Sequence, residues 1–460
     1  MLKNVPYLFM KATFIPVSLP DGIEPEKLAA CLARYSRSKD GIEKILSESK
    51  DKSPDAIFKF IDYGHASIGG LTGGIAIAID AVSMLLAYKL FEFAQMADGQ
   101  ESSTRYIEFS MDGLPKYEDL GLPPTIKDLW TTTMSQGFEL YHIAKNKLEA
   151  VVKNNPESAR IPAEVTGKVK ERMLKNYALD RSRYFLPFAC KTGIAIVATA
   201  RIWADIIKSI DSLDWKEADD LVDQLRDELT KVAPNLIRHS HADQASQFQT
   251  YQQASLSALF TVLGSKGGNL NYRNAECECN CNVEVLDIPG RYSLYCPNNP
   301  FTGKTNRYSQ VGIYIKRQTV RAEWSAIAIA ELRDLNRHRT GFRFSDLTYR
   351  GFYIPQETIE LLNDSDKLKL NVFLKNQLEL VCKLAEASKD GFHPYGFFLG
   401  TQVAFEHTQQ ADKFLYEVEL RTGLGAHFRY AEHLKQAAEL YFKKFPAVRE
   451  YIKIGQNEPE

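Results

Sequence analysis

One order of predicted elements occurs twice along this chain, and this repetition restricts the fold more than any other feature. In the first half, a predicted strand at residues 75–79 precedes a helix at 81–95, and a polar loop then leads to a strand at 105–109. In the second half, a predicted strand at 311–315 precedes a helix at 322–339. Identity between the halves is low, so the order of elements is the main support for a duplicated domain.

Helical periodicity completes both halves of the chain. Residues 263–272 contain three glycines and no apolar periodicity, so we expect the linker there. This divides the chain into domains at residues 1–265 and 275–460. The expected helices are 125–153, 163–184, 193–210 and 215–233 in the first half, and 358–388, 408–422 and 427–442 in the second, with 397–403 extended.

The composition is that of an ordinary soluble globular protein. Of the 460 residues, 44% are hydrophobic and 25% are charged, and the net charge is −1. A nearly neutral chain has no general attraction to nucleic acid or to an anionic membrane, so neither partner is expected. The sequence shows neither an apolar run long enough to span a membrane nor a secretory signal, and a cytoplasmic location is the expectation.

Seven cysteines in a chain of this size do not suggest a disulfide scaffold. Cys277, Cys279 and Cys281 alternate, and in an extended segment they would line one face. Zinc sites usually have two to four residues between paired cysteines, and no histidine completes a set here. Ordinary reduced cysteines are therefore the better interpretation, and we expect no metal site.

The triplet Arg337-His338-Arg339 lies where the predicted helix 322–339 ends. Cations at a helix C-terminus interact favourably with its carbonyl groups, and Gly341 follows where a helix-terminating glycine would stand. The alternative is an anion site, because arginine offers a planar fork of donors that suits phosphate or the carbonyl oxygens of a ring. The triplet alone does not decide between the two.

Two further polar segments are ambiguous in the same way. The run from Gln100 to Tyr106 includes Glu101, Ser103, Thr104 and Arg105, and it has the chemistry of a surface turn entering a strand. Arg183 ends a predicted helix just before Pro187, where it could simply complement the helix dipole. Each segment alone is weak evidence for a binding site.

Together these segments resemble the flavin-dependent thymidylate synthases, whose signature is Arg-His-Arg-x-x-Ser-x-Asn-Glu-x-Ser-x-Arg-Tyr. The first half matches Gly-His-x-Ser at residues 64–67, the later part of the signature at 100–106 and Arg-x-x-Leu-Pro at 183–187. The second half matches the Arg-His-Arg triplet at 337–339 and a further arginine, for which Arg421 fits the spacing better than Arg429.

Each half lacks what the other keeps. Phe93-Ala94-Gln95 stands in place of the triplet in the first half, and residues 208–210 stand in place of the late arginine. In the second half, residues 344–347 replace the Asn-Glu-x-Ser stretch and 397–400 replace Arg-x-x-Leu-Pro. Gly70-Leu71 replaces a Glu-His pair of the family. In the family the nucleotide site lies between two subunits, so the complementary losses suggest one composite site per chain.

The resemblance implies an α+β fold with two tandem domains, each a small, mostly antiparallel sheet flanked by long helices. It implies an enzyme, a methyltransferase that converts dUMP to dTMP with FAD, using methylenetetrahydrofolate and NADPH as co-substrates. Arg337 would be catalytic, and a homodimer would correspond to the family tetramer. The implied nucleotide-binding residues are Glu101, Ser103, Thr104, Arg105, Arg183, Arg337 and Arg421, and the implied flavin-binding residues are His65, Ser67, Arg337, His338 and Arg339.

Two alternatives remain open at this stage. An enzyme of the same fold could methylate another pyrimidine nucleotide, such as a ribonucleotide. The second alternative is a protein that binds nucleotide but neither binds flavin nor catalyses a reaction. The missing Glu-His pair favours this alternative, and the intact Arg-His-Arg triplet argues against it.

Overall fold

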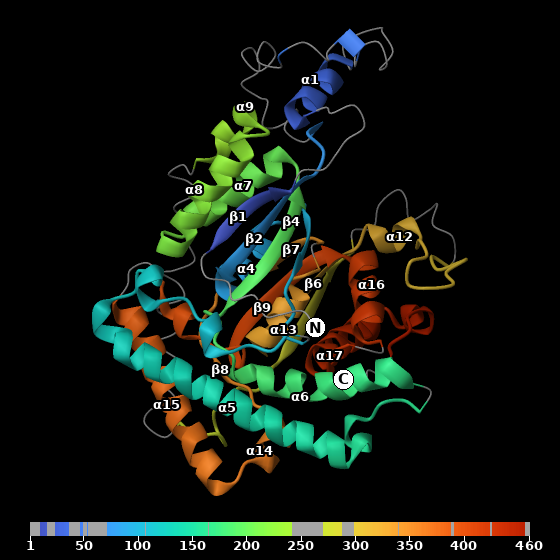
Figure 1. Cartoon of the computed structure of the whole chain (residues 1–460). Helices are drawn as coiled ribbons and strands as arrows, with labels where there is room; N and C mark the ends of the chain where they lie inside the picture. The colour runs from blue at the N-terminus through green and yellow to red at the C-terminus, as the bar shows by residue number, and fades with distance from the viewer. Residues whose placement is uncertain are drawn as a thin grey trace. The chain divides into compact units, whose positions relative to one another are not determined.

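The chain forms two compact units, each of which is described separately (Figure 1). The computed structural model describes residues 10–15, 24–35, 47–48, 53, 71–105, 107–163, 165–241, 270–287, 299–338, 340–387, 391–423 and 426–455. Unit 1 comprises Met1–Ser102, Asp112–Leu122 and Ala189–Tyr251. Unit 2 comprises Ser103–Met111, Pro123–Phe188 and Gln252–Glu460. Both units are therefore assembled from three separate stretches of chain.

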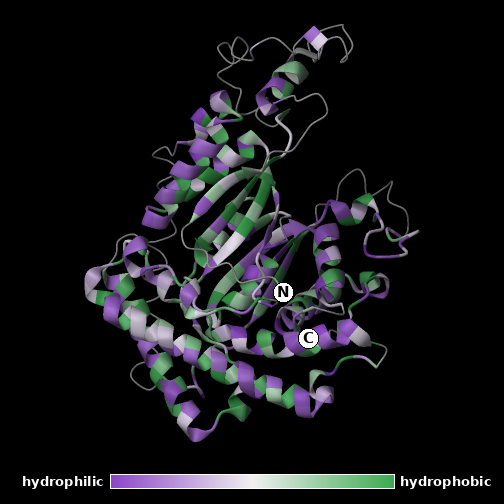
Figure 2. Cartoon of the chain, in the orientation of Figure 1, coloured by the Kyte–Doolittle hydropathy of each residue, from purple (hydrophilic) through white to green (hydrophobic). Residues whose placement is uncertain are grey.

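Unit 1 is built on a four-stranded antiparallel sheet with the order β1-β2-β4-β3. Hydrophobic residues dominate the central strands, and α8 carries hydrophilic residues between hydrophobic ones, as expected for a helix that covers a sheet with one face (Figure 2). The strands are β1 (Lys11–Ile15), β2 (Ile75–Ser83), β3 (Asp98–Glu101) and β4 (Lys191–Ala198). The helices are α1 (Pro25–Tyr35), α4 (Met84–Phe93), α7 (Ala200–Asp211), α8 (Lys216–Thr230) and α9 (Pro234–Ile237).

Helix α4 is buried from Met84 to Glu92, which explains its apolar composition. Ser83 caps it, since the Ser83 hydroxyl accepts a hydrogen bond from the backbone N–H of Leu86 at 3.0 Å. The two charged residues of the helix neutralise each other, with Nζ of Lys89 lying 2.6 Å from Oε2 of Glu92. Helix α4 ends at the apolar residue Phe93. The equivalent helix of the second half is instead followed by the cationic triplet Arg337-His338-Arg339.

Unit 2 contains a five-stranded sheet with the order β5-β6-β9-β7, and β8 pairs with β9. All of its pairings are antiparallel. The strands are β5 (Cys281–Leu286), β6 (Thr319–Ala328), β7 (Phe342–Phe344), β8 (Gly351–Phe352) and β9 (Thr401–Gln410). The helices are α5 (Lys127–Asn154), α6 (Gly167–Ser182), α12 (Ile313–Lys316), α13 (Ile329–Leu335), α14 (Gln356–Leu361), α15 (Asp364–Ala387), α16 (Ala411–Arg421) and α17 (Phe428–Lys444).

The two sheets share one topology. In each, a central strand pairs with the preceding strand and with a strand that follows the long helices. The register of β2 shifts between Ile79 and Val82, and that of β6 shifts between Trp324 and Ile327. A helix begins directly after each of these two strands. This confirms the expected α+β class with two sheet-containing regions and antiparallel strands.

The long helices of unit 2 pack around an aromatic core. The rings of Phe373 and Phe398 meet edge to face with centroids 4.8 Å apart, and Phe352 meets Phe373 at 5.6 Å. Phe185, which follows α6 in the chain, stacks on Phe352 at 6.1 Å. Such aromatic pairs add to the stabilisation from buried area. They fix the end of α6 against β8 and α15, and this end of α6 carries Arg183.

Four of the expected elements are wrong. Helices were expected at 193–210 and 322–339. The first part of each range instead belongs to a strand, β4 (191–198) or β6 (319–328), and only the later part contains a helix, α7 or α13. Both strands alternate buried with less buried residues, a period-two pattern that the small apolar residues obscure. The described residues 105 and 107–109 form no strand where one was expected, and the polar residues Asp98–Glu101 pair with β4. Residues 313–316 form a short helix where 311–315 was expected to be a strand.

The compact units do not divide at the expected linker, since residues 123–188 belong to unit 2 together with the C-terminal part. The compact units are defined by packing, whereas the expected domains are the two halves of a duplicated sequence. The domains at 1–265 and 275–460 therefore stay a prediction. Residues 263–269 of the linker lie outside the described part of the chain. Across the described ranges, no helix has the length and apolar character needed to cross a membrane.

Candidate active site

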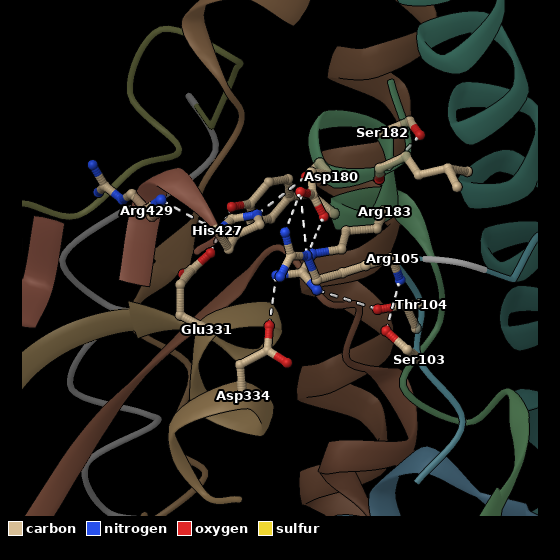
Figure 3. Close-up of polar contacts among 12 residues, drawn as sticks. Ser103, Thr104, Arg105, Asp180, Ser182, Arg183, Glu331, Asp334, His427 and Arg429 are labelled. Carbon is tan, nitrogen blue, oxygen red and sulfur yellow. Dashed lines mark hydrogen bonds and ion pairs between the residues drawn. The ribbon is translucent and has the colours of Figure 1, made fainter. Parts of the chain in front are cut away.

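The last turn of α6 and the residue that follows it bury three charged side chains within unit 2. Asp180, Arg181 and Arg183 are each no more than 1% exposed. Burying an isolated charge is costly, so each of them requires a close partner of opposite charge or a hydrogen-bonding group. The partners come from segments far away in the chain, and together they define a candidate site (Figure 3).

Asp180 holds Arg105, which follows β3 in the sequence. Nε of Arg105 donates to Oδ1 of Asp180 at 2.9 Å, and Nη2 donates to Oδ2 at 3.1 Å. Burial raises the pKa of Asp180, while the guanidinium groups of Arg105 and Arg183 act in the opposite direction. Two parallel hydrogen bonds fix the plane of the Arg105 guanidinium, which is the geometry that arginine prefers with a carboxylate.

The carboxylate of Asp334 lies among the arginines that the sequence singles out. Nη2 of Arg183 donates to Oδ2 of Asp334 at 3.0 Å, and Nη1 of Arg337 lies 3.7 Å from Oδ1. Burial by itself would raise the pKa of Asp334. Four guanidinium groups outweigh burial and hold that pKa well below its usual range, namely those of Arg183, Arg337, Arg105 and Arg421. Asp334 is therefore an anion that draws four cations to one place.

The turn before Arg105 completes this arrangement. Nη1 of Arg183 donates to the hydroxyl of Thr104 at 3.3 Å, and the backbone N–H of Arg105 donates to the hydroxyl of Ser103 at 3.2 Å. Arg183 thus connects the Ser103–Arg105 turn with α13. Its side chain is 2% exposed, whereas that of Arg337 is 21% exposed. Of these two guanidinium groups, Arg337 is the one that solvent reaches.

A second polar network surrounds the residues after α13. Nε of Arg421 on α16 donates to Nε2 of His338 at 2.6 Å. Oε2 of Glu417 accepts from Nε2 of Gln409 at 2.6 Å and lies 3.3 Å from Nδ1 of His407. Burial would raise the pKa of Glu417, but His338 and His407 lower it to about 2. The network ties the Arg337–His338 segment to α16 and β9.

Gly341 has a different role from the one expected. It lies beyond α13, which ends at Leu335, so it does not terminate that helix. Its φ is +76°, and a Cβ at this position would lie 2.1 Å from the carbonyl oxygen of Thr408 on β9. Thr340 is held to the same strand, with its hydroxyl donating to Oε1 of Gln409 at 2.8 Å. The close approach of the backbone to β9 therefore requires glycine here.

A second buried carboxylate, Glu331, lies one turn before Asp334. The Tyr184 hydroxyl donates to its Oε1 at 2.5 Å, and the backbone N–H of Ala328 donates to its Oε2 at 2.9 Å. Burial raises the pKa of Glu331 to about 7, against the opposing effect of Arg429. Arg429 itself lies over the Tyr353 ring at 4.2 Å. Arg429, the alternative late arginine, is therefore engaged there, whereas Arg421 contacts His338.

His427 is a buried residue of this region that the sequence interpretation missed. Its Nδ1 accepts from the backbone N–H of Arg429 at 3.2 Å, which caps α17, and its Nε2 lies 3.5 Å from the carbonyl oxygen of Asp180. Burial, followed by the charges of Arg183, Arg105 and Arg181, lowers the pKa of His427 well below its usual value. A neutral His427 therefore joins the start of α17 to the end of α6.

The strand-like segment after Arg183 crosses its counterpart from the second half. The backbone N–H of Phe188 donates to the carbonyl of Phe397 at 2.9 Å, and that of Leu399 donates to the carbonyl of Leu186 at 2.9 Å. This reciprocal pair makes Leu186 equivalent to Phe397, so Pro394 takes the position of Arg183. The equivalent of Arg-x-x-Leu-Pro is thus residues 394–398 rather than the expected 397–400.

The structure places most, but not all, of the predicted site residues. Unit 2 brings together Ser103, Thr104, Arg105, Arg183, Arg337, His338 and Arg421. Glu101 ends β3 in unit 1 and is 8% exposed there. His65, Ser67 and Arg339 lie outside the described residues. The carboxylates Asp180 and Asp334 were missed, although each stands three residues before a singled-out arginine.

A separate cavity of about 470 Å³ lies on the five-stranded sheet of unit 2. Its lining includes Trp324, Phe344, Phe405 and the Asp346–Arg350 ion pair. None of the predicted site residues lines it. The arginine cluster around Asp334 is therefore the better candidate for the site that the sequence motifs describe.

Comparisons with known proteins agree with the motif resemblance. Residues 19–235 match the model of a family described as thymidylate synthase complementing protein. A flavin-dependent thymidylate synthase of Clostridium tetani is 26% identical over 223 residues, which cover 47% of this chain and 82% of that protein. UPF0159 proteins of Chlamydia pneumoniae and Chlamydia muridarum are each 26% identical, over 235 and 208 residues.

The coverage of these relatives differs. The Chlamydia matches cover 45% and 42% of this chain, but only 43% and 38% of the two relatives, so the chain spans less than half the length of either. Among solved structures, the UMP/dUMP methylase PolB from Streptomyces cacaoi, bound with 5-Br dUMP, is 14% identical with a TM-score of 0.29. That match covers 50% of this chain and 94% of the other.

Proposed function

We propose that this chain, of which residues 19–235 match the model of the family described as thymidylate synthase complementing protein, is a flavin-dependent methyltransferase that converts dUMP to dTMP. One observation carries the proposal. The carboxylate of Asp334 lies beside Arg183 from the first half of the chain and Arg337 from the second. One arginine from each complementary set of motif residues thus lies at the same carboxylate, which supports a single composite site.

The charge of the cluster suits a nucleoside monophosphate. The guanidinium groups of Arg105, Arg183, Arg337 and Arg421 outnumber the carboxylates of Asp180 and Asp334 that they surround. An excess of positive charge suits a phosphate monoester, which carries about −1.5 to −2 at neutral pH. This supports dUMP or a close relative as the ligand.

The roles follow from position and exposure. Ser103, Thr104, Arg105 and Arg183 form one side, where hydroxyl groups and planar guanidinium groups can bind the phosphate or the pyrimidine edge. Glu101, at the end of β3, is proposed as a further ligand of the nucleotide. Arg421 offers a second planar fork from α16. Arg337, 21% exposed, is the catalytic residue in this proposal, because a fixed cation stabilises negative charge that develops on a ring beside it.

The donor set around Arg337 also fits a flavin. The Arg337 guanidinium can meet a flat, electron-rich ring without leaving Asp334, and His338 and Arg339 follow it in the chain, with His65 and Ser67 proposed to complete the contact. FAD would supply the hydride when bound, after reduction by NADPH, and methylenetetrahydrofolate would supply the carbon. The residues of the chain bind, orient and stabilise charge, and no protein nucleophile is needed.

The same topology in both sheets supports a tandem duplication with a single surviving site. The second potential site has lost its arginines, since Phe93-Ala94-Gln95 replaces the triplet and Pro394 takes the position of Arg183. We therefore propose one nucleotide and one FAD per chain. A homodimer in the cytoplasm would correspond to the tetramer of single-domain relatives.

The absorbance spectrum of the purified protein tests the proposal first. Loading with FAD should give flavin bands and one dUMP bound per chain. Reduced flavin should then be reoxidised in the presence of methylenetetrahydrofolate and dUMP, and UMP in place of dUMP tests the alternative ribonucleotide substrate. A chain that binds dUMP but takes up no FAD would instead be the non-catalytic nucleotide-binding protein, which Leu71 in place of the family histidine favours.

A further inference from the structure

The hydrogen bond between Arg421 and His338 depends on the protonation state of the histidine. Nε of Arg421 is a donor, and it lies 2.6 Å from Nε2 of His338. A ring nitrogen that accepts a hydrogen bond carries no proton, so this contact requires Nε2 of His338 to be unprotonated. Protonation of Nε2 would place two donors and two positive charges against each other.

This contact leaves the useful part of the Arg421 side chain available. With Nε bound to His338, the two Nη groups point away as a planar fork. Neither Nη group donates to any residue of the described chain, and the guanidinium carbon lies 5.6 Å from the Tyr430 ring centre. His338 therefore orients the guanidinium of Arg421 without occupying the donors that a ligand would use.

Glu417 offers a second position for His338 once the histidine is charged. Oε1 of Glu417 lies 3.9 Å from Nε2 of His338 and makes no hydrogen bond among the described residues, although the side chain is 1% exposed. Its other oxygen is engaged by Gln409 and His407. A buried carboxylate oxygen at this distance stabilises the imidazolium rather than the neutral ring.

We infer that His338 positions Arg421 for nucleotide binding only while His338 is neutral, and that protonation turns it to Glu417 and releases Arg421. The inference rests on the proposed function, because it takes Arg421 as a ligand of the nucleotide. Binding is then complete above the pKa of His338 and weakens as pH falls through it. The motif resemblance implies only a flavin contact for His338. The inference adds a role in nucleotide binding, through Arg421.

The charged groups packed against this segment limit the explanations of such a pH dependence. Among them, His407 is the other histidine. The others are Arg421 and Glu417 from α16, Arg343 from β7, and Asp334 and Arg337 from the end of α13.

Calorimetric titration with dUMP at several values between about pH 8 and pH 5 tests the inference. His338→Gln keeps a neutral acceptor, so it should bind dUMP within about threefold of the parent at pH 8 and should not follow the parent's decline at low pH. His338→Phe has no acceptor and should bind about tenfold more weakly at pH 8. The dUMP phosphate also titrates near pH 6, but it does so equally in every variant.

Three further variants locate the proton. Glu417→Gln removes the partner of charged His338, so the decline should move about one unit to lower pH. His142→Gln, at an exposed histidine of α5, should retain the parent profile. If His338→Phe binds like the parent, or if His407→Gln and not His338→Gln removes the pH dependence, the inference is wrong. If the parent protein binds no dUMP at any pH, the proposed function itself fails.

Discussion

Nη2 of Arg183 donates to Oδ2 of Asp334 at 3.0 Å, although the two residues are 151 positions apart. Both are buried, so neither charge can be removed without leaving the other uncompensated. The Arg183–Asp334 ion pair therefore contributes both to the stability of unit 2 and to the proposed binding site. Variants must therefore separate the two contributions.

Asp334→Asn should destabilise the chain by about 3 kcal/mol, because the buried Arg183 would lose the carboxylate to which it donates. Urea unfolding at neutral pH measures this loss. Asp112→Asn, at an exposed aspartate, is the matched control and should change stability by less than about 0.5 kcal/mol. Equal stability of the two variants would show that Asp334 does not balance the buried arginines.

Arg183→Lys should retain the fold and lose dUMP affinity by about tenfold or more. A lysine keeps the charge beside Asp334, but it cannot reach Thr104 and Asp334 with a planar fork at the same time. Calorimetry with dUMP and urea unfolding on the same sample separate binding from stability. Arg172→Lys on the exposed side of α6 serves as the control, and a similar loss of affinity there would contradict the assignment.

Stability should depend on pH through Glu331. Its folded-state pKa is raised to about 7, so the folded chain holds a proton that the unfolded chain has lost above about pH 4.5. Stability should therefore fall as pH rises from about 4.5 to about 7, by about 3 kcal/mol at most. Unfolding curves of the parent and Glu331→Gln at pH 5 and pH 8 measure the slope. The Gln variant should lack this part of the decline, and an unchanged slope would rule Glu331 out as its source.

Gly341→Ala should cost about 2 kcal/mol more than Gly303→Ala. Both glycines have positive φ, +76° and +82°, so both substitutions strain the backbone. Only Gly341 has backbone within reach of the new methyl group, with the Thr408 oxygen at 2.1 Å and nothing within 4 Å at Gly303. Thermal unfolding of the two variants compares them directly. Equal costs would show that contact with β9 does not require glycine at 341.

The sequence allowed the arginines to be found because their motifs are local. Arg105, Arg183 and Arg337 each lie in a short run whose residue types and spacing can be recognised without a fold. Their carboxylate partners could also have been predicted. Asp180 and Asp334 each stand three residues before an arginine, and a buried cation needs an anion.

Other parts of the site depend on tertiary structure. Glu417 meets His407 because α16 begins directly after β9 and packs back against it, and the spacing of the two residues in the sequence carries no such signal. Strand β6 was taken for a helix because Ala322, Ala326 and Ala328 suit either structure. Pairing on both edges, with β5 and β9, decided in favour of a strand.

The discontinuity of unit 2 has a consequence for how this chain can be divided. Its three stretches, 103–111, 123–188 and 252–460, contribute Arg105, Arg183 and Asp334 respectively. A cut between residues 242 and 269 would therefore leave two polypeptides, neither of which contains the whole cluster. Co-expressed as separate chains, the two pieces would have to associate to rebuild it, and so would form an obligate heterodimer from a sequence that is now a single gene product.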